Sequence, residues 1–450
     1  MTLLVPDSRA DDRPTQRRTL PKGVAFFLQA SIVVSFLAAS SSPTPLYAVY
    51  QAEWGFSPIT TTVVFGIYAL AVLASLVTLG KLSDHIGRRP VLLTAIALQM
   101  VTMVILTTAS GVPDLLAARI VQGISTGAAL GAVGAGMLDL DKAKGTIANA
   151  VTPMTGTATG SFASGLLVQF LPFRTHLVYL VLLGIFLLQG VGVALMAETS
   201  SPKPGALASL RPQLGVPRAA RRLMLVAVPV LIAVWALAGF YGSVAASVVR
   251  VIVGSDSALL GGLALFVLAG CGALSVLLLR TRPARQVMLL GGLALIVGTG
   301  GVLLSVDARS TVGFFLGTAV AGVGFGAGFQ GAIRTVVPLA AAHERSGLLS
   351  TVYAVSYLAM GLPAVIGGVL VVHGGGLLPT TREYGLTVMA LAALALLGLL
   401  LVRSSPSPVD APVGTSAQRP ASASSDERSR PLAACTSAAS TAPQSSPRSR

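Results

Sequence analysis

Long apolar stretches follow one another through most of this 450-residue chain. Each is close to or above the roughly 20 residues that an α-helix needs to cross a hydrocarbon core of about 30 Å. The pattern therefore predicts an all-α membrane protein with twelve transmembrane helices. The predicted spans are 24–45, 58–80, 90–110, 113–138, 146–171, 176–197, 222–248, 257–279, 286–306, 311–337, 347–372 and 384–402.

The first span has an alternative interpretation as a cleaved signal peptide behind Arg17 and Arg18. It ends in a serine- and proline-rich run at 40–45, and no small-residue cleavage site followed by a soluble domain is present. We therefore interpret this stretch as the first transmembrane helix.

Composition supports the membrane class. Only 10% of the residues are charged and 53% are hydrophobic, with a mean hydropathy of +0.80, whereas a soluble domain carries about 25% charged residues. A soluble enzyme is excluded, and so is disorder over most of the chain, because disorder requires low hydrophobicity.

No pattern typical of an enzyme or a metal site is found. The sequence has no Walker loop, its two cysteines provide no disulfide framework, and its histidines lack metal-ligand spacing. The histidines lie at predicted connections: His85, His176, His343 and His373. We expect no enzymatic activity, no cofactor and no metal.

The net charge of +15 is distributed according to membrane side. If both termini are cytoplasmic, 25 of the 31 Lys and Arg residues lie on the cytoplasmic side and four lie in outer loops. The other two, Arg119 and Arg334, fall inside predicted helices. Positive residues accumulate in cytoplasmic loops, so the charge is a topology signal and indicates no nucleic-acid partner. The strong preference for Arg over Lys is typical of a GC-rich bacterial genome, which places the chain in a bacterial inner membrane.

The longest internal connection is polar and basic and divides the spans into six and six. The last segment is rich in Ser, Pro, Ala and Arg and has no apolar period, so we expect a disordered cytoplasmic tail; docking of its arginines on anionic lipid is the alternative. The predicted segments are 1–23 (cytoplasmic), 24–197 (six-helix bundle), 198–221 (linker), 222–402 (six-helix bundle) and 403–450 (tail).

Charge is concentrated in the connection between the second and third spans. Residues 80–90 read G-K-L-S-D-H-I-G-R-R-P. A positive-inside anchor explains Arg88 and Arg89, but it does not explain an acid, Asp84, between Gly80 and Gly87. Glycine permits a tight turn and close approach of a neighbouring helix.

This loop resembles the G-x-L-[A/S]-D-x-x-G-R-[R/K] motif between helices two and three of the major facilitator superfamily, at every specified position. The resemblance covers about 380 residues, and it implies two pseudo-symmetric six-helix bundles around a cavity that opens alternately to each side. By the same resemblance, Asp84, Arg88 and Arg89 would latch the two bundles together at the cytoplasmic side.

The fourth span carries an arginine inside the predicted membrane region. Arg119, Gly123 and Gly127 are four residues apart and share one face, on which small residues let another helix approach closely. A charge inside the membrane marks a functional site by default; the alternative is an arginine that extends to the outer interface. With Gln122, this segment also resembles the R-x-x-Q-G signature of the superfamily's antiporters, whose arginine is tied to proton coupling.

A weak internal repeat relates the two halves. Gly322 and Gly326 of the tenth span take the places of Gly123 and Gly127 at an offset of 199 residues. Arg334 follows on the same face near the cytoplasmic end, where extension to the interface and function are equal alternatives.

Small residues also line the fifth span, at Gly156, Gly160 and Gly165. They approximate the antiporter pattern G-x-x-x-G-P-x-x-G-G, except that serine replaces the proline. The eleventh span has that proline, Pro363, with Gly367 and Gly368 after it. We expect close helix packing at both spans.

Helices one, four, seven and ten usually line the cavity in this superfamily, and tyrosines on helix eleven would join them. Each polar or aromatic side chain there is either a substrate contact or an ordinary packing residue. The candidates are Gln29, Tyr47, Trp235, Tyr241, Gln330, Tyr353 and Tyr357.

No Asp or Glu lies in the middle of a predicted span. A pump for cationic drugs would normally place one there, so we expect a neutral, amphipathic or anionic substrate and take Arg119 as the central charge. The sequence thus predicts a monomeric secondary transporter that exports small organic molecules by proton-coupled alternating access. The alternatives are an importer of a small metabolite and a transporter-like sensor or assembly protein that transports nothing.

Overall fold

The computed structural model describes residues 20–254, 257–341 and 343–402. Over these ranges the chain is helical and contains no strand. The predicted tail 403–450 and most of the predicted N-terminal segment lie outside the described residues. The helices are α1 (Lys22–Ser41), α2 (Tyr47–Trp54), α3 (Pro58–Leu79), α4 (Ser83–Ile86), α5 (Arg88–Thr107), α6 (Val112–Leu140), α7 (Lys142–Phe170), α8 (Leu177–Ala194), α9 (Ala206–Ser209), α10 (Arg221–Ser243), α11 (Ala245–Val253), α12 (Ala258–Leu278), α13 (Ala284–Asp307), α14 (Thr311–Val336), α15 (Arg345–His373) and α16 (Leu377–Leu401).

Among the described residues, eleven helices are long and apolar enough to cross a membrane. The exception among the predicted spans is α7, which has 29 residues but is rich in threonine and glycine. Its threonine hydroxyls are satisfied within the helix: Thr152 donates to the carbonyl of Ala148 at 2.8 Å, and Thr157 to that of Pro153 at 3.0 Å. The all-helical membrane fold is confirmed, and the number of twelve spans stays a prediction.

The first and seventh predicted spans are each broken near one end. Pro43 and Pro45 lie in the turn between α1 and α2, where each lacks the N–H that would continue a helix. The chain breaks again at Val244, between α10 and α11. Both short helices, α2 and α11, end at a left-handed glycine, Gly55 and Gly254. The corresponding breaks support the internal repeat.

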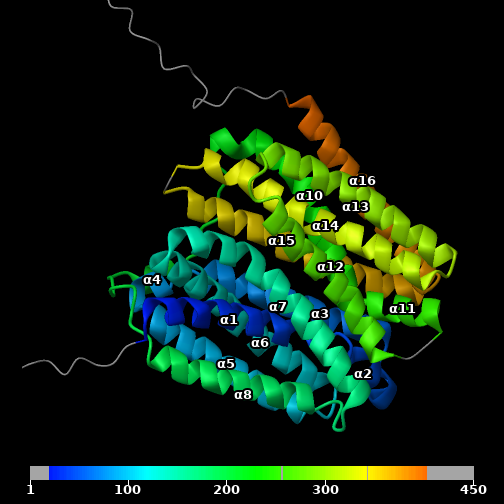
Figure 1. The fold of residues 1–450 in the computed structure, drawn as a ribbon, viewed down its shortest axis with the longest axis horizontal. Coiled ribbons are helices and arrows are strands. Elements are labelled where there is room, and N and C mark those ends of the chain that lie inside the picture. Colours follow the sequence, from blue (N-terminus) through cyan, green and yellow to red (C-terminus); the bar gives the residue numbers. More distant parts are fainter. Residues whose placement is uncertain (1–19, 255–256, 342, 403–450) are drawn as a thin grey trace, which may run out of the picture. The chain divides into compact units, whose positions relative to one another are not determined.

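Each half of the chain has its own apolar core. Helices α1–α8, the N-terminal half, surround one cluster, and α10–α16, the C-terminal half, surround another. The halves meet where α3 packs against α15 and α7 against α12, and Figure 1 shows α7 and α12 side by side where the halves adjoin. A third, smaller cluster joins α3 to α10 and α15. Met154 of α7 even belongs to the core of the C-terminal half.

We call the end of the helices that carries residues 198–221 the linker side. Close contacts between the halves lie toward the opposite side. A Cβ atom at Gly165 of α7 would lie 3.1 Å from the Cα of Leu259 in α12, and one at Gly66 of α3 would lie 2.8 Å from the side chain of Val365 in α15. The Thr44 hydroxyl also donates to the carbonyl of Gly242 at 3.2 Å. The two halves are therefore tightly joined at the side opposite the linker.

Candidate functional site

The loop at 80–90 makes a turn that requires glycine. Gly87 has a φ of +102°, in the region that residues with a Cβ rarely adopt. A Cβ there would also lie 2.7 Å from a carboxylate oxygen of Glu198. Gly80 instead lies where α6 approaches the loop closely: a Cβ on Gly131 of α6 would lie 2.7 Å from the carbonyl oxygen of Gly80. The two glycines of the motif thus have different local purposes.

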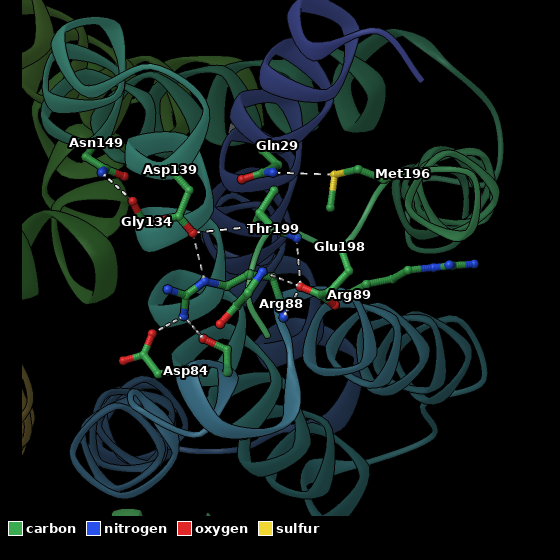
Figure 2. Close-up of polar contacts among 12 residues, drawn as sticks. Gln29, Asp84, Arg88, Arg89, Gly134, Asp139, Asn149, Met196, Glu198 and Thr199 are labelled. Carbon is green, nitrogen blue, oxygen red and sulfur yellow. Dashed lines mark hydrogen bonds and ion pairs between the residues drawn. The ribbon is translucent and has the colours of Figure 1, made fainter. Parts of the chain in front are cut away.

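Arg88 is the centre of a charge cluster on the linker side (Figure 2). Its side chain is buried, and its guanidinium donates to the Ser83 hydroxyl at 2.7 Å, to Asp139 at 3.3 Å and to Asp84. A buried charge is tolerated when its donors are paired. Asp139 comes from the end of α6, so the cluster ties the loop to the helix that carries Arg119. No local pattern in the sequence indicated this pairing.

Asp141, two residues beyond Asp139, has a different role. Its carboxylate accepts the backbone N–H of Lys144 at 2.9 Å and caps α7. This hydrogen bond lowers the pKa of Asp141 below its ordinary value, because it stabilises the ionised carboxylate.

Glu198 supplies the N-terminal cap of α5 from the far end of the N-terminal half (Figure 2). Its carboxylate accepts the backbone N–H groups of Arg88 at 2.8 Å and Arg89 at 2.9 Å. It also accepts those of Thr199 and Ser200. Gly87, the residue before the helix, has no side chain that could accept these hydrogen bonds. The carboxylate of Glu198, from a distant part of the same chain, satisfies the free N–H groups instead. The capping acid lies 110 residues away in sequence, and no local signal identified it.

Replacement of Glu198 by alanine is expected to lower the free energy of unfolding by about 1 kcal/mol, the usual cost of losing a cap. It should also speed trypsin cleavage at the exposed Lys203 and Arg211, because the start of the linker loses its anchor. Thermal unfolding and a trypsin time course on the purified protein measure both. Glu383→Ala is the control, since Glu383 is exposed and its carboxylate has no hydrogen-bond partner among the described residues. Equal behaviour of the two variants would contradict the capping role.

The predicted latch residues bond within the N-terminal half. Besides its capped N–H, Arg89 reaches the carbonyl of Ala194 in α8, and Asp84 pairs with Arg88. Among the described residues, none of the polar contacts of Asp84, Arg88 and Arg89 reaches the C-terminal half. The direct latch between the bundles therefore stays a prediction.

The linker connects the loop to the C-terminal half. Lys81 of the loop donates to the side chain of Gln213. Two residues on, the N–H of Gly215 contacts the Thr351 hydroxyl at 3.0 Å and the carbonyl of Gly347 at 3.3 Å, both in α15. The backbone N–H of Lys203 also donates to the carbonyl of His85 at 2.8 Å. The linker is thus bonded to both halves.

Arg119 is 1% exposed, although it lies in a predicted membrane helix. Its guanidinium donates to the Tyr47 hydroxyl at 3.1 Å, to the carbonyl of Ser40 at 2.9 Å and to the Gln122 side chain at 2.5 Å. It also lies 5.1 Å from the ring centroid of Tyr68 in α3. The side chain therefore points into the N-terminal half. This excludes the alternative that it extends to the outer interface of the membrane with water. Among the described residues no carboxylate pairs with it.

The glycine rows of α6 and α14 have equivalent neighbours. A Cβ at Gly123 would lie 2.9 Å from the backbone of Tyr68 in α3, and one at Gly127 would lie 2.8 Å from the carbonyl of Val72. In the C-terminal half, a Cβ at Gly322 would lie 2.5 Å from the carbonyl of Leu268 in α12. Gly326 packs against α12 in the same way. The offset of 199 residues thus relates two equivalent helix pairs, α6–α3 and α14–α12.

The small residues of α7 and α15 lie at helix contacts as well. Gly156 and Gly160 pack against the backbone of α1, whereas Gly165 packs against α12 in the other half. Pro363 lies inside α15, and Gly368, five residues on, packs against Thr62 of α3.

The structure brings together only some of the predicted cavity residues. Trp235, Tyr353 and Tyr357 gather beside α3 at the contact between the halves. The others are apart, in separate surroundings: Tyr47 bonds to Arg119, Gln29 to the sulfur of Met196, Tyr241 to Thr318, and Gln330 to the carbonyl of Val276. Tyr68 and Phe329 belong near the first group but were not predicted.

Comparisons with known proteins agree with this architecture. A mutant form of the nucleoside transporter NupG has a similar structure, with a TM-score of 0.63 and 12% identity, covering 83% of this chain and 99% of that one. The cephamycin export protein CmcT of Amycolatopsis lactamdurans is 33% identical over 142 residues, which are 30% of this chain and 29% of the relative. An uncharacterized transporter of Rickettsia bellii is 36% identical over 74 residues, 16% of this chain and 18% of that protein.

The chain thus spans less than a third of the length of these two sequence relatives, and the solved structure supports the fold alone. The model of the Major Facilitator Superfamily, however, matches residues 30–355. Because this match covers well over half of the sequence and agrees with the loop at 80–90 and the two helical halves, the chain belongs to the Major Facilitator Superfamily.

Proposed function

We propose that this protein is a secondary active exporter of small organic molecules that carry no positive charge, driven by protons through alternating access. The observation that carries the proposal is the buried Arg119, which has no carboxylate partner among the described residues. Such a charge is costly in a membrane and is retained where it has a function. The export activity named for the relative from Amycolatopsis supports the direction.

Proton coupling is proposed from the residues around Arg119. Arg119 and Gln122 match the antiporter signature, and both bond to the end of α1, at the carbonyls of Ser40 and Ala39. A change at this point would move α1 and α2 relative to α6. The acids of the described residues lie at helix ends or in connections, apart from Glu383, which is exposed in the second turn of α16; this favours a substrate without positive charge.

Alternating access is supported by the distribution of contacts between the halves. Close contacts at Gly66, Gly165 and Thr44 lie toward the side opposite the linker. If the linker side is cytoplasmic, as its basic residues suggest, this arrangement suits an exporter that loads its substrate from the cytoplasm. We further propose a monomer in a bacterial inner membrane, with both termini cytoplasmic.

The linker is proposed to transmit movement between the loop at 80–90 and α15. Thr351→Val removes the hydroxyl that contacts Gly215 and keeps the shape of the side chain. Turnover is expected to fall about twofold to fivefold with little change in KM, the effect of one hydrogen bond worth about 0.5–1 kcal/mol. Transport kinetics in proteoliposomes measure this.

Thr387→Val is the matched control for the linker experiment, because among the described residues the Thr387 hydroxyl bonds only within α16, to the carbonyl of Glu383 at 2.8 Å. A turnover of Thr351→Val equal to that of Thr387→Val would refute the linker's role.

Vesicle orientation tests the direction of transport. With an imposed proton gradient, an exporter accumulates the neutral dye Nile red in everted bacterial membrane vesicles, and a protonophore abolishes the accumulation. Accumulation of small metabolites only in right-side-out vesicles would instead establish the importer. No accumulation of either kind by folded protein would favour the sensor.

A further inference from the structure

Aromatic side chains from both halves gather at the contact between α3, α10, α14 and α15. The Trp235 ring lies 5.4 Å from the ring of Phe329 and 5.1 Å from that of Tyr357, centroid to centroid. Tyr68 of α3 and Tyr353 of α15 belong to the same apolar cluster. We call these five residues the inter-half aromatic cluster. Because Tyr68 comes from the other half, any molecule bound among these rings would contact both halves.

Among the described residues, one polar atom of this cluster is both shielded from solvent and without a hydrogen-bond partner. The indole Nε1 of Trp235 is inaccessible to solvent and makes no hydrogen bond. Outside the cluster, two tyrosine hydroxyls of the C-terminal half are paired: that of Tyr241 bonds to Thr318 at 2.7 Å, and that of Tyr384 donates to the carbonyl of Ala236 at 2.8 Å. A buried donor is normally satisfied, so this N–H would gain a partner from an acceptor on a molecule that enters between the rings when the halves move apart.

The charges around the cluster disfavour a cation. The Arg119 guanidinium lies 5.1 Å from the ring centroid of Tyr68 and already occupies the vicinity of that ring. Among the described residues, no carboxylate pairs with this guanidinium to balance its charge. In a low-dielectric interior this positive charge repels another cation and attracts an electron-rich or anionic group.

We propose that the inter-half aromatic cluster binds a planar aromatic molecule that carries no positive charge and offers an acceptor to the Trp235 N–H. This inference rests on the proposed function, because it assigns a substrate class to the same transporter. The rings supply stacking and edge contacts to the flat ligand, and the indole N–H fixes its orientation. Trp235 thereby selects a carbonyl, carboxylate or ring-nitrogen acceptor.

The chain offers a direct reporter of binding, since it has two tryptophans, Trp54 and Trp235. In the Trp54→Phe variant all tryptophan emission comes from Trp235. The purified variant in lipid nanodiscs is titrated with neutral coumarin, with anionic 2-naphthoate and with the flat cation N-methylquinolinium. Calorimetry measures the affinities, and the emission shows whether Trp235 is the site.

Coumarin and 2-naphthoate are expected to bind saturably and to change the Trp235 emission, whereas N-methylquinolinium should bind at least about tenfold more weakly, because a like charge is nearby. Trp235→Phe, which keeps a ring and removes only the N–H, should weaken calorimetric binding about tenfold, since a buried hydrogen bond is lost. Trp54→Phe should leave the affinity unchanged.

Equal affinity for the cation, equal affinity in Trp235→Phe, or no saturable binding to folded Trp54→Phe protein would each overturn the proposal. If Trp235→Phe fails to fold, the comparison of cation with anion in Trp54→Phe still decides. Binding needs no gradient, so it is separate from transport. Saturable binding of coumarin and 2-naphthoate without dye transport in vesicles would refute the exporter and leave the proposed binding site intact. Transport of Nile red without binding of these probes would refute the binding site and leave the exporter intact.

Discussion

Replacement of Arg119 by alanine is expected to reduce gradient-driven dye efflux to the background seen without the protein. The substitution removes the donor to Tyr47, Ser40 and Gln122, which hold α2, α1 and α6 together at one point. It leaves buried acceptors without partners, at about 1–3 kcal/mol each. Nile red efflux from energised cells of a pump-deficient bacterial host measures the loss.

Two comparisons separate coupling from stability. Arg119→Ala should still exchange labelled for unlabelled substrate without a gradient, which a misfolded protein cannot do. Arg334→Ala is the matched control: Arg334 is the basic residue on the equivalent face of α14, and its guanidinium donates to the carbonyls of Leu279 and Arg282 near the helix end. It should keep most of its efflux. Wild-type efflux by Arg119→Ala would refute the central role of this charge.

Replacement of Gly160 by alanine is expected to be the most damaging single methyl addition to the N-terminal half. The new Cβ would overlap the Cα and the carbonyl of Ala38 in α1. Because the overlap is with backbone, no side-chain rotation relieves it and the two helices must separate. Overpacking of this kind costs about 1–3 kcal/mol, so the melting temperature, the yield of folded protein and transport should all fall.

Gly184→Ala is the control for this experiment. Gly184 lies in the middle of α8, and a Cβ there would have nothing within 4 Å. The same chemical change should therefore leave the melting temperature unchanged or raise it, because alanine favours a helix over glycine. Equal melting temperatures for the two variants would show that α1 and α7 do not depend on close approach at this point.

Local pattern was sufficient for features that follow from spacing along one helix. Arg119, Gly123 and Gly127 share a face because a helix turns once every 3.6 residues, and the structure places all three toward α3 and its neighbours. The turn at Gly87 was equally predictable from the sequence, because a glycine inside a charged motif indicates special backbone geometry.

Contacts between distant segments were not predictable in this way. Glu198 caps α5 although 110 residues separate it from Arg88, and the hydroxyl of Tyr47 accepts a hydrogen bond from Arg119, 72 residues away. Both outcomes depend on how helices pack, and one sequence does not contain that information in its periodicity. The aromatic cluster around Trp235 combines side chains from four helices for the same reason.

Sequence alone therefore determined the membrane class, the division into two halves, the loop at 80–90 and the position of Arg119 inside a membrane helix. These follow from hydropathy and helical period, which are local properties of the chain. Tertiary structure decided which side chains meet: that Arg119 is buried without an acid among the described residues, that the linker bonds to both halves, and that Trp235 has a free N–H. Such contacts arise from the packing of helices distant in sequence, where hydrogen-bond partners are set by geometry.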